Sequence, residues 1–448
     1  MHAAQASLTA PPGRSHLLDA AIAFAIRVAS AGLVFLLQVF LARMMDLGDY
    51  GSYVTAWTWL VMLGAFAPLG IAESAVRFLP RYRARGRHGS AKAFFRFGLR
   101  TVLLASLMIA GIAVILAMAG NWLDNRVGLM ILMVAAGLPF LATQNFLEGV
   151  ARAHGWYRLT SVPIYLLRPL IIMAGCAAFY FAGTVLDLTA VSVVVVSAMA
   201  IISVGLLVVV SRAMTGEPQA ATPQSITGSR RVWFKASIPL MLVSGVEDLL
   251  IYSDVLVLGI LLDPDQVSVY FAAARALALA NFVYYAFYFV SARGFSISNA
   301  LADRKKLQEA VWATTRATFW FTALAVAATL VAGPWLLAAF GESFAAGYTS
   351  MWILGAGLIL RAVAGQSAEL LITTGRQRDM LVASATALVF NVCLSFLLVP
   401  HFGIEGAAAA TALAMGARAI MLCLAVRNSL NLSVISFGLP SLRFTAAG

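Results

Sequence analysis

Five arginine residues interrupt stretches of sequence that are otherwise apolar enough to lie inside a membrane. They are Arg27, Arg168, Arg275, Arg361 and Arg418. A cation at the centre of a membrane helix costs roughly 2.5 to 3.5 kcal/mol, so such residues persist mainly where a protein interior or a water-filled cavity receives them. The arginines therefore predict a polar path across a membrane that suits an anionic group.

For two of these arginines, Arg27 and Arg275, helical spacing shows which residues lie on the same face of the helix. At helical spacing, Arg27 shares its face with small and polar residues as far as Gln38, and no acid lies within one turn of it. This face is expected to line a cavity in which Arg27 binds a ligand. Arg275 begins a stripe that includes Phe282 and Tyr285, whose rings are suited either to sugar contact or to packing.

Acidic residues also occur within the apolar stretches. Three of them lie near the middle of one stretch, and a fourth lies two helical turns after Arg361 in another. These residues are Glu247, Asp248 and Asp254, and Glu369. Two interpretations remain open for them: static pairing with arginines of neighbouring helices, or binding of a proton or sodium ion whose movement drives a transport cycle.

The other buried arginines differ in depth. Arg168 directly precedes Pro169 and, like Arg361, is interpreted as a cavity residue. Arg418 lies about two turns from the end of its apolar stretch, from where a long side chain could reach the membrane surface. Arg418 is therefore the weakest candidate of the five.

Composition indicates the class of protein. Of the 448 residues, 61% are hydrophobic and 11% are charged, and the mean hydropathy is +0.89. These values exclude an ordinary soluble domain and predict an all-α polytopic membrane protein. Twelve transmembrane spans are expected, at residues 19–42, 51–72, 98–119, 128–150, 161–182, 188–211, 236–261, 268–291, 312–333, 347–371, 380–399 and 404–426.

Basic residues are distributed unevenly over the loops between these spans. When the 31 lysines and arginines are sorted by alternate loops, 24 fall on one side, two on the other and five within spans. By the positive-inside rule, both chain termini are cytoplasmic. Because topology and anionic headgroups already explain the net charge of +12, we expect no nucleic-acid partner.

Motifs for catalysis or cofactor binding are not found in the sequence. The cysteines Cys176, Cys393 and Cys423 fall within spans and lack the spacing of metal ligands, and the five histidines lie at termini or in loops. We therefore expect neither a metal nor a cofactor. Transport would then draw its energy from a proton or sodium gradient or from the membrane potential.

The spans divide into two sets of six. The longest polar connection, 212–235, separates an expected amino-terminal lobe (19–211) from a carboxy-terminal lobe (236–426), with cytoplasmic segments at 1–18 and 427–448. A weak repeat at an offset of 217 residues matches Asp46, Tyr53 and Ala56 with Asp263, Tyr270 and Ala273. Parallel repeats of this kind predict a binding site between the two lobes.

Two stretches of the sequence resemble signatures of a known family. Residues 41–53 read LARMMDLGDYGSY and resemble the aRxLgpxdyGxY pattern of bacterial polysaccharide flippases. Residues 400–411 read PHFGIEGAAAAT and resemble their PxxGIxGAAxAT pattern. These flippases belong to the multidrug, oligosaccharidyl-lipid and polysaccharide exporter superfamily, and the resemblance implies its fold, in which two six-helix lobes form a V around a central cavity.

The resemblance also implies a cargo, an oligosaccharide repeat unit on undecaprenyl diphosphate. This cargo would be flipped across a bacterial inner membrane by alternating access, for O-antigen, capsule or exopolysaccharide biosynthesis. Relatives that move the peptidoglycan lipid precursor use arginines on the first, second and eighth helices. Arg27 and Arg275 match the first and eighth, whereas the second helix here has no deep arginine. Guanidinium groups bind diphosphate oxygens well, often in bidentate fashion.

The implied partners are membrane lipids, the polysaccharide polymerase, and chain-length and export proteins. Two alternative functions remain. A cation-coupled multidrug exporter shares the architecture, but cationic drugs call for an acidic lumen rather than five arginines. A membrane enzyme of glycan assembly needs a sizeable periplasmic loop, whereas every predicted outer loop is short. The expected protein is thus a secondary transporter or lipid flippase and not an enzyme.

Overall fold

The structure is a computed structural model that describes residues 14–215, 227–282, 284, 286–287, 291, 294–295 and 304–434. The description excludes the side chains of residues 14–25, 27–28, 157, 215 and 227–229. Helices and short connections make up the described residues, and no strand occurs among them. Because the bilayer offers no partners for backbone amides and carbonyls, apolar segments of this length must satisfy them within helices.

The first half of the chain consists of α-helices, most of them long, and one π-helical turn. Its elements are α2 (Arg14–Met44), α3 (Leu47–Phe66), α4 (Ile71–Ala84), α5 (His88–Ala119), α6 (Arg126–His154), α7 (Tyr157–Val162), the π-helix η1 (Pro163–Leu167), α8 (Arg168–Phe181) and α9 (Leu188–Thr215). The second half contains α10 (Thr227–Leu261), α11 (Pro264–Ala278), α13 (Arg304–Val331), α14 (Gly333–Phe340), the 3₁₀ helix η2 (Glu342–Gly347), α15 (Tyr348–Val363), α16 (Ser367–Thr373) and α17 (Gln377–Leu430).

Several predicted spans are broken or bent. Among the described residues, eight helical segments are long and apolar enough to cross a membrane. The predicted second span, 51–72, covers most of α3 and only the start of α4. A turn separates the two helices, and in it Leu69 and Gly70 have φ of 51° and 71°. Helix α17 contains the last two predicted spans, and Gly403 (φ 57°, ψ −134°) bends the chain between them.

The bend in α17 explains one of the two sequence signatures. Only glycine adopts the positive φ of Gly403 without strain. A Cβ on Gly406 would lie 2.5 Å from the Leu398 carbonyl oxygen, so only glycine fits there as well. Ala407 and Ala408 are fully buried in the helix that follows. The signature therefore encodes a tight reversal between two closely packed helices.

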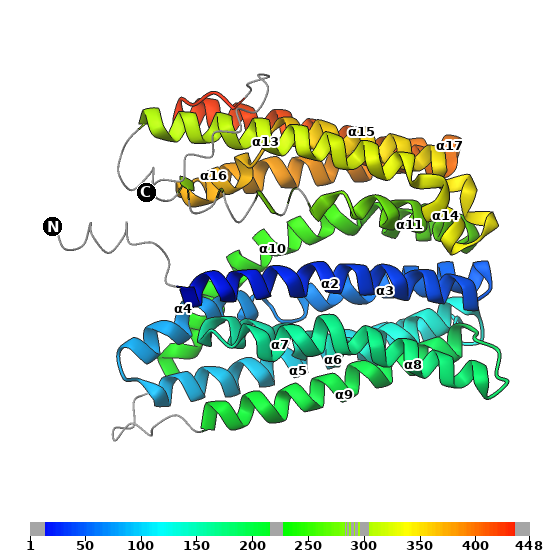
Figure 1. Ribbon diagram of the computed structural model, residues 1–448. Coiled ribbons are helices and arrows are strands. Elements are labelled where there is room, and N and C mark those ends of the chain that lie inside the picture. The colour runs from blue at the N-terminus through cyan, green and yellow to red at the C-terminus, as the bar shows by residue number, and fades with distance from the viewer. Residues whose placement is uncertain are drawn as a thin grey trace.

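The helices form two bundles that lie side by side, the first half of the chain in one and most of the second half in the other (Figure 1). We call the end of the molecule that carries the exposed arginines Arg77, Arg81 and Arg85 the basic end. The opposite end, with Asp46 and Asp263, is the acidic end. The basic end lies on the left of Figure 1, near α4 and α16.

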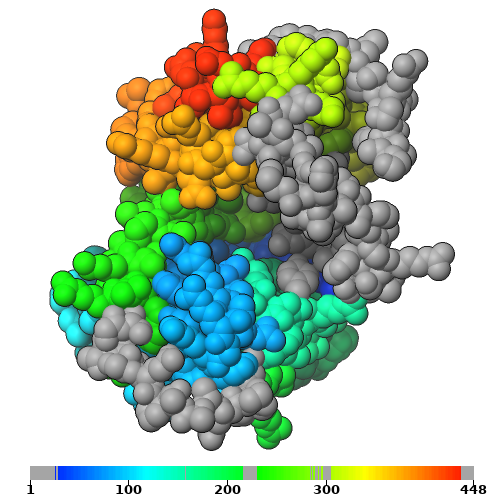
Figure 2. All heavy atoms as spheres, turned by 90° about the vertical axis from the view of Figure 1, so that its left-hand side faces the viewer, coloured from blue at the N-terminus to red at the C-terminus, as the bar shows by residue number. Residues whose placement is uncertain are grey.

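The two bundles are joined at the acidic end. Gly51 of α3 packs directly against the carbonyl of Pro264, which starts α11. The Tyr50 ring lies 6.1 Å from the Phe344 ring and 6.5 Å from the Phe271 ring, measured between centroids. Figure 2 looks onto the basic end, where the surface is hollowed between the blue first-half residues and the orange second-half residues. The described residues of the two bundles thus meet at the acidic end and leave a hollow at the basic end.

Helix α10 packs on both bundles. Near its start, Trp233 Nε1 donates to the Tyr82 hydroxyl at 2.7 Å, and Ser237 Oγ donates to Ser74 Oγ at 2.9 Å. Its later turns pack on α17. Helix α9 ends at Thr215 and α10 begins at Thr227, and both bounds lie within the predicted linker 212–235.

Candidate functional site

The second bundle lines a cavity of about 400 Å³. Its lining comes from α10, α11, α15, α16 and α17, together with the residues that follow α11 and α15. The expected binding site lies between the lobes, whereas this cavity is lined by second-half residues throughout. Its charged lining residues are Glu247, Asp254, Arg275, Arg361, Glu369 and Arg418. It therefore gathers three of the five arginines and three of the four acids that the sequence singles out.

Arg275 reaches the cavity from α11. Its guanidinium carbon lies 4.5 Å from the centroid of the Phe271 ring, one helical turn earlier. Within the described part of the chain, no salt bridge joins Arg275 to an acid, although Asp254 lines the same cavity. An aromatic ring holds the guanidinium in place without using its N–H donors. Those donors are consequently available to an anion.

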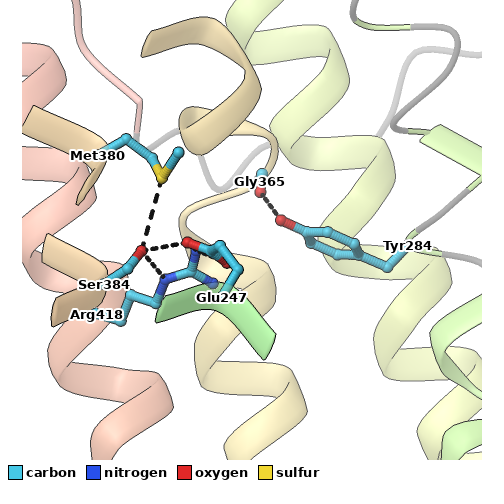
Figure 3. Close-up of polar contacts among 6 residues, drawn as sticks. All are labelled: Glu247, Tyr284, Gly365, Met380, Ser384 and Arg418. Carbon is cyan, nitrogen blue, oxygen red and sulfur yellow. Dashed lines mark hydrogen bonds and ion pairs between the residues drawn. The ribbon is translucent and has the colours of Figure 1, made fainter. Parts of the chain in front are cut away.

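Arg361 is held near the end of α15 by residues that follow α11. Its Nη2 donates to Asn281 Oδ1 at 2.7 Å, and its guanidinium carbon lies 4.2 Å from the centroid of the Tyr284 ring. Tyr284 is fixed in turn, since its hydroxyl donates to the Gly365 carbonyl at 2.9 Å (Figure 3). The Arg361 Nε is buried without a partner among the described residues. The Arg361 guanidinium is therefore held in a fixed orientation, and its Nε remains a buried donor without a partner among the described residues.

Arg418 forms an ion pair inside the cavity. Its Nη2 lies 2.7 Å from both carboxylate oxygens of Glu247, and its Nε donates to Ser384 Oγ at 3.1 Å (Figure 3). Ser384 Oγ also donates to Glu247. The interpretation of Arg418 as an end charge that reaches the membrane surface is wrong, because its side chain points inward and neutralises an acid. Of the two interpretations of Glu247, the structure shows static pairing.

The other predicted acids lie in different surroundings. Asp254 is 8% exposed and accepts hydrogen bonds from the Tyr270 hydroxyl at 2.6 Å and its neighbour's amide at 2.7 Å. Glu369 is buried on α16 and lines the same cavity. Asp248 is half-buried on α10 and does not belong to the lining. Two acids at the cavity therefore remain outside the Arg418 ion pair.

The remaining predicted site residues are spread over other parts of the protein. Arg168 lies in the first bundle, where Nη1 donates to Gln144 Oε1 at 3.1 Å. Gln38 is 3% exposed and accepts from the Tyr50 hydroxyl at 3.1 Å, so it belongs to the packed acidic end. Phe282 is half-buried and does not line the cavity. The side chain of Arg27 and the whole of Tyr285 lie outside the described residues.

Several uncharged polar residues line the cavity but are not among the site residues predicted from the sequence. Asn281, Tyr284, Gln366 and Asn391 all face the cavity. An amide inside an apolar span also needs a polar partner, although its cost in lipid is lower than that of a charge. Asn281 and Asn391 each lie within a predicted span. This signal could have identified both as candidate cavity residues.

The fold and the charged cavity define a class, the multi-pass membrane proteins with the two-lobed architecture of transporters. The chain belongs to the polysaccharide biosynthesis protein family, whose sequence profile matches residues 17–293. Among curated proteins, no significant match to the chain exists.

Solved structures of the multidrug and flippase superfamily share this fold. An inward-facing multidrug resistance MATE family transporter of the MOP superfamily has a TM-score of 0.72 and 13% identity, over 91% of this chain and 98% of that chain. The lipid II flippase MurJ, in an inward closed conformation, has a TM-score of 0.68 and 15% identity, over 91% and 87%. An outward-facing MATE family transporter has a TM-score of 0.63 and 14% identity, over 92% and 94%. The predicted all-α fold with two lobes is confirmed.

Proposed function

We propose that the protein flips oligosaccharide repeat units linked to undecaprenyl diphosphate from the cytoplasmic to the periplasmic leaflet of a bacterial inner membrane. Membership of the polysaccharide biosynthesis family supports the pathway, and the fold shared with a lipid II flippase supports the type of transport. In this proposal the basic end is cytoplasmic, in accordance with the positive-inside rule. The hollow at the basic end then receives the cargo from the cytoplasmic leaflet.

The observation that carries the proposal is the presence of two available guanidinium groups in one cavity. Arg275 and Arg361 both line it, and neither forms a salt bridge among the described residues. A diphosphate that leaves water needs its charge matched by donors of this kind. Arg418 adds no net charge because Glu247 neutralises it. Arg27 and Tyr285 keep their predicted roles, as a diphosphate ligand and a sugar contact, as part of the proposal.

Cation movement is the proposed energy source. Asp254 and Glu369 are buried at the cavity outside the Arg418 ion pair, and Asp248 lies nearby on α10. After the cargo leaves, a proton or sodium ion bound at these acids would reduce the cost of carrying buried negative charge through the return step. The Arg418 ion pair makes Glu247 the weakest candidate for this role.

The proposal is tested by removing the two guanidinium groups one at a time. We expect Arg275→Ala and Arg361→Ala each to lower flipping of the lipid-linked repeat unit by about tenfold or more, since a charge-assisted hydrogen bond in a desolvated site contributes about 1.5 to 3 kcal/mol. The measurements are surface polysaccharide in a flippase-deficient strain and flipping by purified protein in liposomes. Liposomes with imposed proton or sodium gradients test the coupling.

A matched control is Arg77→Ala, which removes the same charge from an exposed position at the basic end. This variant should flip at the wild-type rate. If Arg275→Ala and Arg361→Ala proteins, expressed at wild-type level, sustain full surface polysaccharide, the cavity does not hold the diphosphate. A flipping rate that does not change with either the proton or the sodium gradient would contradict the proposed coupling but not the proposed diphosphate site.

A further inference from the structure

The first bundle contains a polar cluster that the diphosphate site does not use. We infer that Trp57, Gln144, Glu148, Tyr165 and Arg168 form a separate saccharide subsite, which binds the sugar next to the diphosphate of the cargo. This inference rests on the proposed function, and it assigns Arg168 to the sugar rather than to the phosphates.

Arg168 is oriented by a fixed acceptor. Its Nη1 donates to Gln144 Oε1 at 3.1 Å, and Gln144 is fully buried, with its Nε2 donating to the Met199 carbonyl at 2.9 Å. The Arg168 guanidinium carbon lies 5.5 Å from the centroid of the Trp57 ring. This is the one hydrogen bond of Arg168 within the described residues, and a guanidinium has five N–H donors. Arg168 can therefore donate several more.

Glu148 lies one helical turn after Gln144 on α6. Its two carboxylate oxygens each lie 3.2 Å from the Tyr165 hydroxyl. Among the residues that the structure describes, no salt bridge joins Glu148 to Arg168. An ionised carboxylate offers about four acceptor positions, so a hydroxyl donor from a ligand can still be accommodated. The cluster thus presents an acceptor and a donor side by side.

The π-helical turn η1 positions Tyr165 and Arg168 against α6. It spans Pro163–Leu167 and ends directly before Arg168, and π-turns inside helices occur frequently at functional sites. Across it, Tyr165 faces Glu148 and Arg168 faces Gln144, so two polar contacts connect antiparallel segments one turn apart. In a membrane helix such polar side chains persist where they face a cavity or one another. The half-buried exposure of Glu148, Tyr165 and Arg168 fits a cavity wall.

The chemistry of the cluster fits a sugar better than a phosphate. Glu148 needs a hydrogen-bond donor, and an ionised diphosphate offers acceptors only. Neighbouring hydroxyls of a sugar ring can both donate to Glu148 and accept from Arg168. Trp57 adds an aromatic ring, a surface that suits the apolar face of a sugar. A row of aromatic rings connects the cluster to Arg275: neighbouring ring centroids of Trp57, Tyr53, Tyr50 and Phe271 lie 6.3 to 6.5 Å apart, and the Arg275 guanidinium lies over Phe271. In the inferred arrangement, a diphosphate at Arg275 extends its attached sugar along this row toward the first bundle.

Binding of two lipids tests the subsite separately from the proposed function. The probes are undecaprenyl diphosphate and the lipid-linked repeat unit that accumulates in a strain lacking this gene, each titrated into purified protein in detergent. We expect Glu148→Gln and Trp57→Leu to weaken binding of the glycosylated lipid by about tenfold and to leave the bare lipid within about twofold. Arg275→Ala should weaken both lipids. Trp335→Leu, which changes a tryptophan that is 72% exposed, is the matched control.

Each other outcome has a defined meaning. Equal loss of both lipids in Glu148→Gln and Trp57→Leu, or no loss of either, overturns the saccharide subsite. Wild-type protein that binds both lipids equally well also overturns it, while the proposed flippase function stands. Wild-type protein that binds neither lipid contradicts the proposed function itself. Thermal unfolding of each variant shows whether a loss reflects misfolding, and Arg168→Lys then gives a third, more conservative substitution with the same expected pattern.

Discussion

Among single residues, Glu247 and Arg418 show how a cavity in a membrane protein tolerates charge. Their side chains are 32% and 15% exposed, and the pair is completed by Ser384. Removing one partner leaves the other charge in the cavity without compensation, which is costly, whereas removing both leaves no charge. We expect Glu247→Gln and Arg418→Gln each to destabilise the protein by about 2 kcal/mol, and the double variant to recover most of this loss.

Thermal unfolding in detergent measures these changes, with Arg126→Gln as control. Arg126 forms a salt bridge with Asp49 at 3.1 Å, but it is 50% exposed, and exposed pairs contribute little. Additive losses in the double variant would show that Glu247 and Arg418 do not depend on each other.

The same pair shows which part of the site the sequence could predict. Buried charges are visible as interruptions of apolar stretches, and Arg275, Arg361, Asp254 and Glu369 all line the cavity. The partner of each charge is not visible, because it depends on how distant helices pack. Arg418 lies 171 residues from Glu247. The position of Arg418 near the end of a span is equally compatible with a side chain that reaches the membrane surface and with one that points into the cavity.

At the level of elements, the two halves of α17 depend on a backbone contact at Gly406. A Cβ there would meet the Leu398 carbonyl, and neither helix can yield without moving its buried alanines. We expect Gly406→Ala to cost about 1 to 3 kcal/mol through overpacking. Gly111→Ala on α5 should be neutral or stabilising, because a Cβ there meets nothing within 4 Å and alanine favours a helix. The unfolding temperatures of the two variants test this prediction. Equal unfolding temperatures for Gly406→Ala and Gly111→Ala would contradict the tight packing at Gly406.

Hydropathy predicts where the helices lie, but it does not predict the turns that interrupt them. The apolar stretches became helices, because lipid leaves the backbone no alternative. The break between α3 and α4 at Leu69 and Gly70, and the π-turn before Arg168, each occur inside a stretch that was predicted as a single span. A turn inside a span depends on local φ and ψ and on close contacts such as that of Gly70 with the Ser237 carbonyl. Those contacts come from another helix and are not present in the local sequence.

For the whole molecule, the family signature at residues 41–53 marks the closed end. Tyr50 and Gly51 pack against the second bundle, and Arg43 crosses to it as well. The Arg43 Nε donates to the Ala339 carbonyl at 2.8 Å and its Nη2 to the Ala338 carbonyl at 2.5 Å. These carbonyls belong to the last turn of α14, where a helix lacks its own donors and favours a cation. Arg43 therefore stabilises the state that is closed at the acidic end.

Loss of Arg43 should shift the protein toward opening at the acidic end. In a variant without native cysteines, Phe35→Cys and Phe340→Cys report closure, because the two rings lie 5.5 Å apart across the bundles. We expect Arg43→Ala to slow disulfide formation between these positions by roughly fivefold or more, since two charge-assisted hydrogen bonds favour the closed state. Arg126→Ala, whose salt bridge lies within the first bundle, should leave the rate unchanged. If both substitutions slow it equally, general charge at the acidic end, and not the contact with α14, holds the bundles together.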